Sequence, residues 1–217
     1  MKKTFIIAEA GVNHNGDINL AYKLIDAAYE AGVDAVKFQT FKTEKILSES
    51  TEKASYQKKN TGEEESQYNM IKKLEISYND FSELKNYCDE KGIMFLSTPD
   101  EEESLDFLAD ELKVPYLKIG SGEVTNIPFL KAFARKNIPI ILSTGMSDIA
   151  EVSCALDAIY SEGFNKDIWL LHCTTNYPCP YNEVNLNAMI TLKNTFKVHV
   201  GYSDHTLGTD IPIAAVA

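Results

Sequence analysis

Short runs of β-branched and aliphatic residues recur seven times along the 217-residue chain, and this repetition constrains the fold more than any other feature. Runs of this length and composition, with little strict alternation, are typical of parallel strands that are buried on both faces. We therefore predict seven strands, over residues 5–10, 35–40, 93–98, 116–121, 138–144, 168–174 and 198–204.

Helical patterns occupy the intervals between these runs. Residues 20–32 place apolar side chains at helical spacing and end at Gly32, and residues 77–92 begin with a serine or asparagine cap and end at Gly92. Further helices are expected to begin near residues 101, 127, 148 and 186, and the final residues, 208–217, read as the start of another. The chain thus repeats a strand–helix unit.

One interval is longer than the others. Residues 41–76, after the second predicted strand, form a polar and charged insertion with few large aliphatic side chains. Such an insertion is a solvated excursion, a lid or a partner contact. It follows the carboxyl end of a strand, which is where barrel enzymes hold their active-site loops.

The repeated unit fits either an open doubly wound sheet or a (β/α)8 barrel. A doubly wound nucleotide-binding fold has a glycine-rich phosphate loop after its first strand, whereas this chain has AEAGVNHNGD there. We therefore predict an α/β fold of the (β/α)8 TIM-barrel type, formed by residues 1–217. Because only seven strand patterns are present, we expect the barrel to be truncated before an eighth strand just beyond Ala217.

Composition excludes several classes of function. The chain has 32 acidic and 21 basic residues and a net charge of −11, which disfavours binding to nucleic acid or to an anionic membrane. It has no run of 18 apolar residues that would span a bilayer. Its four cysteines form no CxxC pair, so we expect a reduced, cytoplasmic protein.

Two lysines lie inside apolar strands, where an unpaired charge costs several kcal/mol. Lys37 lies in AVKFQT and Lys118 in YLKIGS, and period-two alternation places Lys37 on the same strand face as Gln39. Two such lysines at the mouth of a barrel would form an anion site. The alternative is a structural pairing of the lysines with Glu9 or Glu123.

Hydroxyl and imidazole groups follow the same strand ends. Ser121 and Ser143 suit either a phosphate site or a turn or helix cap. His205 follows the seventh run and could bind a divalent metal, and Tyr177 lies in a proline-bounded loop where it either orients a ligand or packs. We expect His14 and His172 to contact substrate or to serve structure, His199 to pack in its strand, and Cys173 and Cys179 to be buried and not nucleophilic.

The ordered motifs of this chain resemble the sialic acid synthase family. They are IIAEAGVNHNGD, DAVKFQTF, FLSTPD, KIGSGE, ILSTGM, LHCTTNYPCPYNEVNL and GYSDHTLG. The resemblance implies a barrel synthase domain that condenses phosphoenolpyruvate with N-acetylmannosamine or a related acetamido-sugar. The products would be N-acetylneuraminate or legionaminate, together with phosphate. Family members usually add a C-terminal antifreeze-like domain, which these 217 residues do not contain, and the full-length protein is expected to be a homodimer.

The resemblance also assigns roles to individual residues. It implies that phosphoenolpyruvate is held by Lys37, Lys118, Ser121, Ser143 and Ser203. It implies that the acceptor sugar and the reacting carbon are surrounded by Glu9, Gln39, Glu123 and Tyr177. His205 matches one of two histidines that bind Mn²⁺ or Mg²⁺, and the second has no counterpart in this chain.

The implied reaction forms a carbon–carbon bond. The methylene carbon of phosphoenolpyruvate attacks the sugar aldehyde, which the metal polarises, and water then adds to the oxocarbenium-like centre before phosphate leaves. Lys37 and Lys118 would hold the carboxylate and phosphate, and Glu9 or Glu123 would shield the cationic centre or move a proton. Two rival hypotheses stay open: a Schiff-base aldolase with Lys118 as nucleophile, and a non-catalytic barrel that binds a sugar phosphate.

Overall fold

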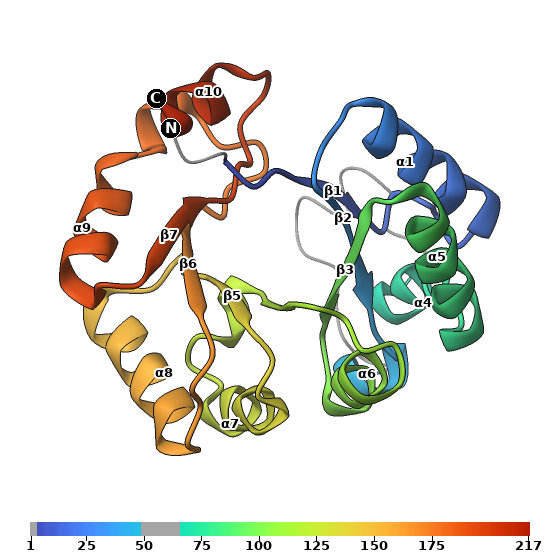
Figure 1. The fold of residues 1–217 in the computed structure, drawn as a ribbon, viewed down its shortest axis with the longest axis horizontal. Helices are drawn as coiled ribbons and strands as arrows, with labels where there is room; N and C mark the ends of the chain where they lie inside the picture. The colour runs from blue at the N-terminus through green and yellow to red at the C-terminus, as the bar shows by residue number, and fades with distance from the viewer. Residues whose placement is uncertain (1–3, 49–65) are drawn as a thin grey trace. The chain divides into compact units, whose positions relative to one another are not determined.

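The computed structural model describes residues 4–48 and 66–217 (Figure 1). The chain divides into two compact units, Met1–Val114 and Pro115–Ala217, and each unit carries its own parallel sheet. All seven predicted strands are present, and their observed bounds lie within a few residues of the predicted ones. The prediction of an α/β fold with parallel strands is therefore confirmed.

The first unit contains a three-stranded sheet in the order β1 (Ile7–Gly11), β2 (Ala35–Thr40) and β3 (Met94–Pro99). Helices α1 (Ile18–Glu30) and α5 (Tyr78–Lys91) pack against each other and against these strands, on one side of the sheet (Figure 1). Val36, Phe38 and Phe95 are buried, and the rings of Phe38 and Phe95 stack with centroids 5.7 Å apart. Lys37 and Gln39 alternate with these residues and therefore lie on the opposite face.

Local signals in the sequence explain where the long helices of this unit begin and end. A capping box starts α5, because Ser77 and Asp80 each accept a hydrogen bond from the backbone amide of the other. Gly92 ends it with φ of 76°, a left-handed conformation that favours glycine. These are the two boundary residues that the sequence predicts.

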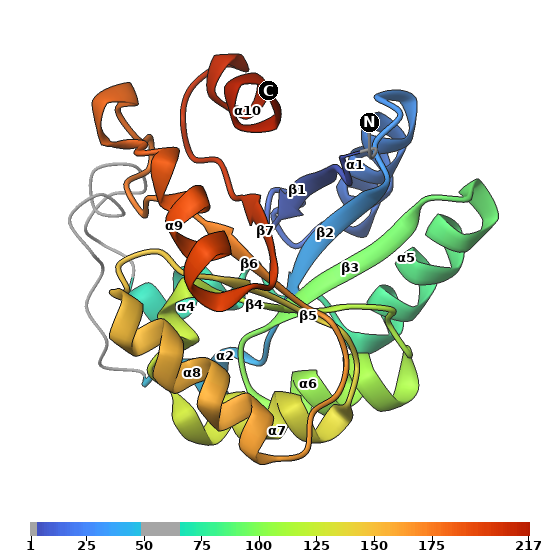
Figure 2. The same ribbon diagram turned by 60° about the vertical axis from the view of Figure 1, so that its left-hand side comes forward.

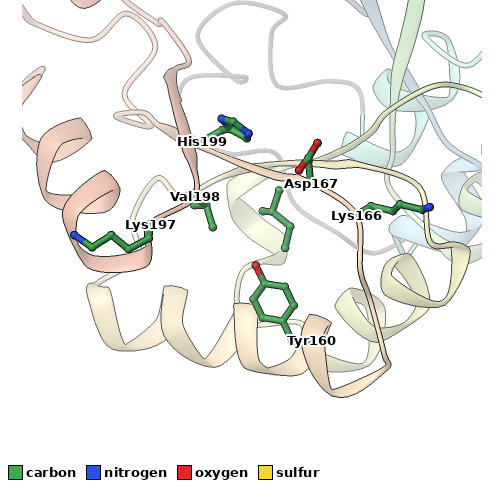
Figure 3. A pocket seen from close by; sticks show the side chains of 7 residues that line it. Tyr160, Lys166, Asp167, Lys197, Val198 and His199 are labelled. Atoms are coloured by element: carbon green, nitrogen blue, oxygen red, sulfur yellow. The ribbon is translucent and has the colours of Figure 1, made fainter.

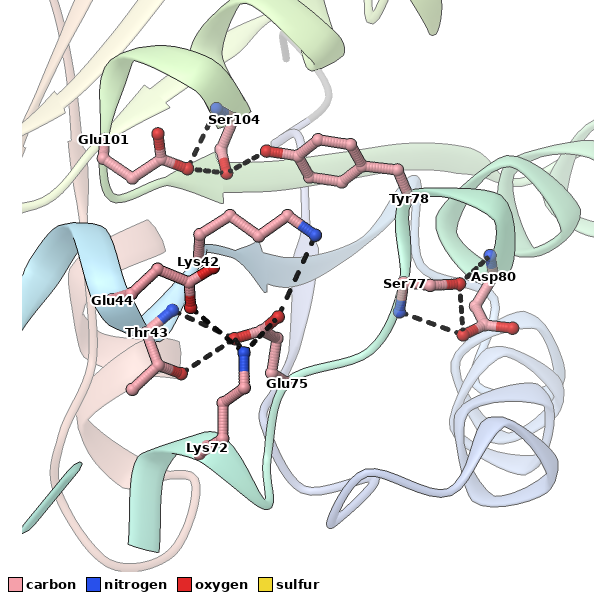
Figure 4. A network of polar contacts seen from close by, with 10 residues as sticks. All are labelled: Lys42, Thr43, Glu44, Lys72, Glu75, Ser77, Tyr78, Asp80, Glu101 and Ser104. Atoms are coloured by element: carbon pink, nitrogen blue, oxygen red, sulfur yellow. Dashed lines mark hydrogen bonds and ion pairs between the residues drawn. The ribbon is translucent and has the colours of Figure 1, made fainter. Parts of the chain in front are cut away.

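The described ends of the insertion are packed. They form two short helices that contact each other, α2 (Thr43–Ile46) and α4 (Gln67–Lys72), while residues 49–65 lie outside the described residues. The Glu75 carboxylate accepts hydrogen bonds from the Thr43 amide at 2.9 Å, the Thr43 hydroxyl at 2.8 Å and Lys72 at 3.0 Å (Figure 4). Thr43 is fully buried, so the described start of the insertion is packed at this residue.

A second contact secures the start of α5. The Tyr78 ring stacks on Phe107 with centroids 4.1 Å apart, and its hydroxyl lies 3.1 Å from the Ser104 hydroxyl (Figure 4). These partners lie in the π-helix η1 (Phe107–Glu111) and in α6 (Glu102–Asp106). Burial raises the pKa of Tyr78 to about 12, so the ring stays neutral beside the Lys42 ammonium that lies over it.

The second unit contains a four-stranded parallel sheet in the order β4 (Leu117–Ile119), β5 (Ile140–Ser143), β6 (Ile168–His172) and β7 (His199–Tyr202). Its other elements are η2 (Ser121–Glu123), α7 (Ile127–Lys136), α8 (Ile149–Ser161), η3 (Tyr181–Glu183), α9 (Asn187–Phe196) and α10 (Asp210–Val216). Helices α7 and α8 pack together, and α9 lies along β6 and β7 (Figure 2).

The strand register separates an apolar face from a polar one. Leu117, Ile119, Leu142 and Leu170 lie on one face and are fully buried. Lys118 pairs with Ile141 and therefore shares the other face, where Ser143 follows two residues later. Among residues 4–48 and 66–217, no helix combines the length and the hydropathy that a membrane crossing requires.

Candidate active site

In the first unit, Lys37 is the centre of a polar cluster on the sheet face opposite Val36 and Phe38. Its ammonium nitrogen lies 2.7 Å from a carboxylate oxygen of Glu9 and donates a hydrogen bond to the Thr98 hydroxyl at 3.1 Å. Lys37 is 7% exposed, whereas the Glu9 side chain is 54% exposed, so the pair has one buried and one solvated partner. The structural pairing with Glu9 that the sequence offered as an alternative is therefore present.

A break in the strand register brings Glu9 and Gln39 together. Glu9 pairs with Lys37 but Gly11 pairs with Phe38, so Ala10 is an extra residue in β1. Gly11 has φ of 52°, and a Cβ atom there would lie 3.3 Å from a Glu9 carboxylate oxygen and 4.0 Å from the Gln39 amide nitrogen. Three predicted site residues, Glu9, Lys37 and Gln39, thus meet at the carboxyl ends of β1 and β2.

Thr98 belongs to this cluster, although the sequence analysis assigned it no role. It pairs with Gln39 in the register of β2 and β3 and is buried. The sequence feature that could have identified Thr98 is a hydroxyl residue at the end of an apolar run, which is the feature that identified Ser143.

In the second unit, Lys118 forms the corresponding centre. Its ammonium group donates to the Ser143 hydroxyl at 2.7 Å and to the Ile119 carbonyl at 2.7 Å, and Lys118 is 7% exposed. The two side chains come from neighbouring strands, β4 and β5. A buried ammonium beside a hydroxyl at a strand end is suited to binding an anion.

Ser121 lies next to this pair through the loop that follows Ser143. The Gly145 amide donates a hydrogen bond to the Ser121 hydroxyl at 2.9 Å, and the Cys173 sulfur lies 3.2 Å from the same oxygen. Cys173 and Cys179 are both buried, as expected. Gly145 and Cys173 are additional site residues that the sequence analysis did not assign.

The remaining acidic and hydroxyl candidates occupy loop positions. Glu123 accepts a hydrogen bond at 2.7 Å from Asn126, the residue that caps α7, so its carboxylate is tied to the start of that helix. Ser203 follows β7, and its backbone amide donates to the His172 carbonyl at 2.8 Å. Both residues lie at the carboxyl ends of strands, as predicted.

His205 is held by the loop that follows β6. Its Nδ1 atom lies 2.5 Å from the Thr174 carbonyl oxygen, and because a carbonyl oxygen only accepts hydrogen bonds, Nδ1 is the donor of this bond. The Tyr177 ring lies against the imidazole with centroids 4.0 Å apart, and Tyr177 itself is 71% exposed. Among the described residues, no group of three or more His, Cys, Asp or Glu side chains could hold a metal ion.

The other histidines have contacts within the protein. His172 shares its strand face with the fully buried Leu170, and its Nε2 atom bonds to the Val184 carbonyl at 2.7 Å. His14 is fully buried and its Nδ1 accepts a hydrogen bond from the Gly16 amide. His199 stacks on Trp169 at 4.9 Å, which agrees with the predicted packing.

A surface depression of about 250 Å³ lies at the amino ends of β6 and β7, opposite to the ends that carry Ser143 and Ser203. It is lined by Tyr160, Lys166, Asp167, Ile168, Lys197, Val198 and His199. Figure 3 shows the side chains of Lys166 and Lys197 pointing away from each other, so they do not converge on one anion. None of the candidate site residues other than His199, which was expected only to pack, lines this depression.

Several known proteins are similar in sequence to this chain. An N,N'-diacetyllegionaminic acid synthase of Campylobacter jejuni is 53% identical over 100% of this chain and 65% of its own length. A protein of the same name from Legionella pneumophila is 52% identical over 98% of this chain and 60% of its own length. The chain thus spans less than two thirds of these curated relatives.

A solved structure is similar over the same extent. It is the N-acetylneuraminic acid (sialic acid) synthetase of Leptospira borgpetersenii in complex with citrate, with a TM-score of 0.85 and 35% identity over 99% of this chain and 70% of that one. The model of the NeuB family matches residues 24–217, which is most of the sequence. On this match and these identities, the chain belongs to the NeuB family.

Proposed function

We propose that this chain is the synthase part of an enzyme that condenses phosphoenolpyruvate with a 2,4-diacetamido sugar to give N,N'-diacetyllegionaminic acid and phosphate. The observation that carries the proposal is the buried Lys118 ammonium bonded to Ser143, with Ser121 held beside it by the loop that follows Ser143. The choice of sugar is supported by the names of the two relatives that are 53% and 52% identical.

The proposed roles follow from charge and hydrogen-bonding capacity. Lys118 and Lys37 would offset the negative charges of the phosphate and carboxylate groups, which is an electrostatic role that acts strongly in a buried site. Hydroxyl donors suit the phosphate oxygens, because they approach closely and their hydrogens rotate toward the acceptor. The residues proposed to hold phosphoenolpyruvate are Lys37, Lys118, Ser121, Ser143 and Ser203.

The acceptor sugar and the reacting carbon are proposed to lie against Glu9, Gln39, Glu123 and Tyr177. The Glu9 carboxylate is solvated on one side and bonded to Lys37 on the other, which suits a group that stabilises a developing positive charge. Glu9 is therefore the stronger candidate of the two glutamates, because Glu123 is bonded to Asn126.

We also propose that His205 binds Mn²⁺ or Mg²⁺ through Nε2. The support is the Nδ1 hydrogen bond to the Thr174 carbonyl, which orients the ring and leaves Nε2 as the donor atom. The chemistry expected of such an ion, when bound, is polarisation of the aldehyde oxygen of the open-chain sugar. Tyr177 would orient His205 through the contact between their rings.

The test is a product analysis with two acceptors and a control without sugar. The protein is incubated with phosphoenolpyruvate and either N-acetylmannosamine, 2,4-diacetamido-2,4,6-trideoxymannose or no sugar, and phosphate release and product mass are measured. We expect phosphate release with the diacetamido sugar and the mass of N,N'-diacetyllegionaminic acid. Faster turnover of N-acetylmannosamine would overturn the choice of sugar but not of reaction.

The rival reactions give different outcomes in the same assay. A Schiff-base aldolase would be trapped as a covalent adduct on Lys118 by borohydride and a keto-substrate, and a chelator would not inhibit it. A non-catalytic barrel would bind phosphoenolpyruvate without releasing phosphate. We expect no adduct, inhibition by chelator and continuous phosphate release, so either alternative result would contradict the proposed reaction.

We propose the (β/α)8 barrel as the architecture of the synthase. The support is the alternation of parallel strands and helices within each unit and the TM-score of 0.85 with the Leptospira synthetase. In a barrel of this type the carboxyl ends of all strands face the active site, which is where the predicted site residues lie in each sheet.

The cellular location, the class of ligand and the oligomeric state of the protein are also proposed. We propose a reducing, cytoplasmic location because all four cysteines carry free thiols. We also propose that the ligands are small-molecule substrates and that the protein binds neither nucleic acid nor a membrane. A homodimer is proposed from the resemblance to sialic acid synthases. Sedimentation of the full-length protein at two concentrations checks the dimer, and a monomer at both would refute it.

A further inference from the structure

We propose that Cys173 is a positioning residue, whose thiol donates a hydrogen bond to the Ser121 hydroxyl and thereby directs the Ser121 proton toward an oxygen of a bound phosphoryl group. The identity of that anion rests on the proposed function. The hydrogen-bond arrangement rests on contacts within the second unit alone.

The argument begins with the capacity of a hydroxyl group, which has one proton and two acceptor positions. The Gly145 amide occupies one acceptor position of Ser121 at 2.9 Å. The Cys173 sulfur lies 3.2 Å away and either donates its S–H to Ser121 or accepts the Ser121 proton. If the thiol donates, both acceptor positions are filled and the O–H is left to bond with an external acceptor.

The opposite arrangement would remove the function of Ser121. A hydroxyl proton committed to the Cys173 sulfur would leave lone pairs facing an anion, which repels them. Sulfur is also a weak acceptor compared with a phosphate oxygen. An anion bound at Ser121 therefore selects the arrangement in which the thiol is the donor.

Packing holds the thiol in this place. Cys173 is 5% exposed, and a Cβ atom at Gly145 would lie 2.8 Å from its sulfur and 3.0 Å from the Ser121 hydroxyl. The loop that carries Gly145 is fixed to β6, because the Thr144 amide donates to the Leu171 carbonyl at 2.9 Å. Thus Ser121, Gly145 and Cys173, from the ends of three neighbouring strands, touch one another without room for a larger group.

The experiment compares Cys173→Ala, which removes the donor, with Cys173→Ser, which keeps one. Cys154→Ala is the matched control, because Cys154 is an exposed thiol on α8. In the full-length protein we expect Cys173→Ala to raise KM for phosphoenolpyruvate about fivefold, the effect of one hydrogen bond, with a smaller change in kcat. Cys173→Ser restores KM to near the wild-type value, and Cys154→Ala leaves both constants unchanged.

Infrared spectroscopy tests the donor without any turnover. The S–H stretch that disappears in Cys173→Ala is expected at a lower frequency than that of Cys154, which is the signature of a donating thiol, and to move upward in Ser121→Ala. An S–H stretch that does not respond to Ser121→Ala would overturn the proposal. The proposal would also be overturned if Cys173→Ala and Cys173→Ser raised KM equally and lowered Tm equally, because that result would indicate a packing role alone.

A failure of the proposed function gives a different result. If the wild-type protein does not turn over phosphoenolpyruvate, the variants are compared by calorimetric binding of inorganic phosphate. Weaker phosphate binding by Cys173→Ala that Cys173→Ser restores supports the positioning role even so. Equal phosphate binding by all three proteins would contradict it.

Discussion

The ammonium group of Lys118 lies 2.7 Å from the hydroxyl oxygen of Ser143, and the two residues come from neighbouring parallel strands, β4 and β5. The same ammonium donates to the Ile119 carbonyl, so its charge is held at the carboxyl end of the sheet. Substitution of Lys118 can therefore separate the effect of its charge on turnover from its effect on the free energy of unfolding.

Replacing Lys118 by Met removes the charge and keeps much of the apolar stem. We expect kcat/KM to fall by about 100-fold or more, the usual effect of losing an electrostatic contact to a reacting group. The free energy of unfolding should change by no more than about 2 kcal/mol, because relief of charge burial offsets the lost hydrogen bonds to Ser143 and Ile119. Lys131→Met, at a partly exposed pair with Glu162, is the control. Retained turnover in Lys118→Met at saturating substrate would refute the role.

Gly145→Ala tests how tightly the serine loop is packed. The new methyl group would lie 2.6 Å from the Thr175 methyl carbon and 2.8 Å from the Cys173 sulfur, so the loop must shift. We expect a loss of about 1–3 kcal/mol in the free energy of unfolding, measured by urea denaturation, and a raised KM for phosphoenolpyruvate. Adding Thr175→Ser removes the nearest methyl group and should recover part of both losses. No recovery in the double variant would show that this contact is not the cause.

His14 should make the stability of the protein depend on pH. Burial lowers the pKa of His14 below its ordinary value of 6.5, so the unfolded chain binds a proton at this residue before the folded chain does. The free energy of unfolding should therefore decrease as the pH falls below about 6.5. His14→Asn keeps an acceptor for the Gly16 amide and should flatten this slope in urea denaturation between pH 5 and 8, whereas His199→Asn, at an exposed residue, should keep it. An unchanged slope in His14→Asn would contradict the assignment.

Glu75 should stabilise the described ends of the insertion. Burial alone would raise the pKa of Glu75, but the hydrogen bonds from Thr43 and Lys72 outweigh burial and lower it. The contribution of the Glu75 carboxylate to the free energy of unfolding is therefore fully present above the ordinary carboxyl pKa of 4.5, and it is lost as the pH falls through the lowered pKa. We expect Glu75→Ala to cost about 2 kcal/mol, and Glu75→Gln less, because the amide still accepts from Thr43.

Hydrogen exchange reports directly on this contact. The Thr43 amide bonded to Glu75 should exchange faster in Glu75→Ala than in the wild type, and at an intermediate rate in Glu75→Gln. Glu44→Gln, at the exposed partner of Lys72, is the control and should leave the exchange rate unchanged. Equal exchange rates in all four proteins would show that Glu75 does not hold this segment.

Much of the local structure could be predicted from patterns that need no knowledge of the fold. The strand β2 has the predicted bounds, because a short run rich in apolar and β-branched residues favours an extended, buried segment. The cap residues Ser77 and Gly92 end α5 as predicted, because capping depends on residues within one turn of the helix end. Alternation also placed Lys37 and Gln39 on one face.

The contacts that build the site were decided by tertiary structure. The sequence determined that Lys37 and Lys118 lie inside strands and that Ser121 and Ser143 stand at strand ends, because strand length and side-chain period are local properties. It did not determine that Lys37 bonds to Thr98, that His172 faces the Val184 carbonyl or that Cys173 touches Ser121. Each of these pairs joins segments separated along the chain, and strand register and loop path, which no local pattern contains, bring their atoms to hydrogen-bonding distance.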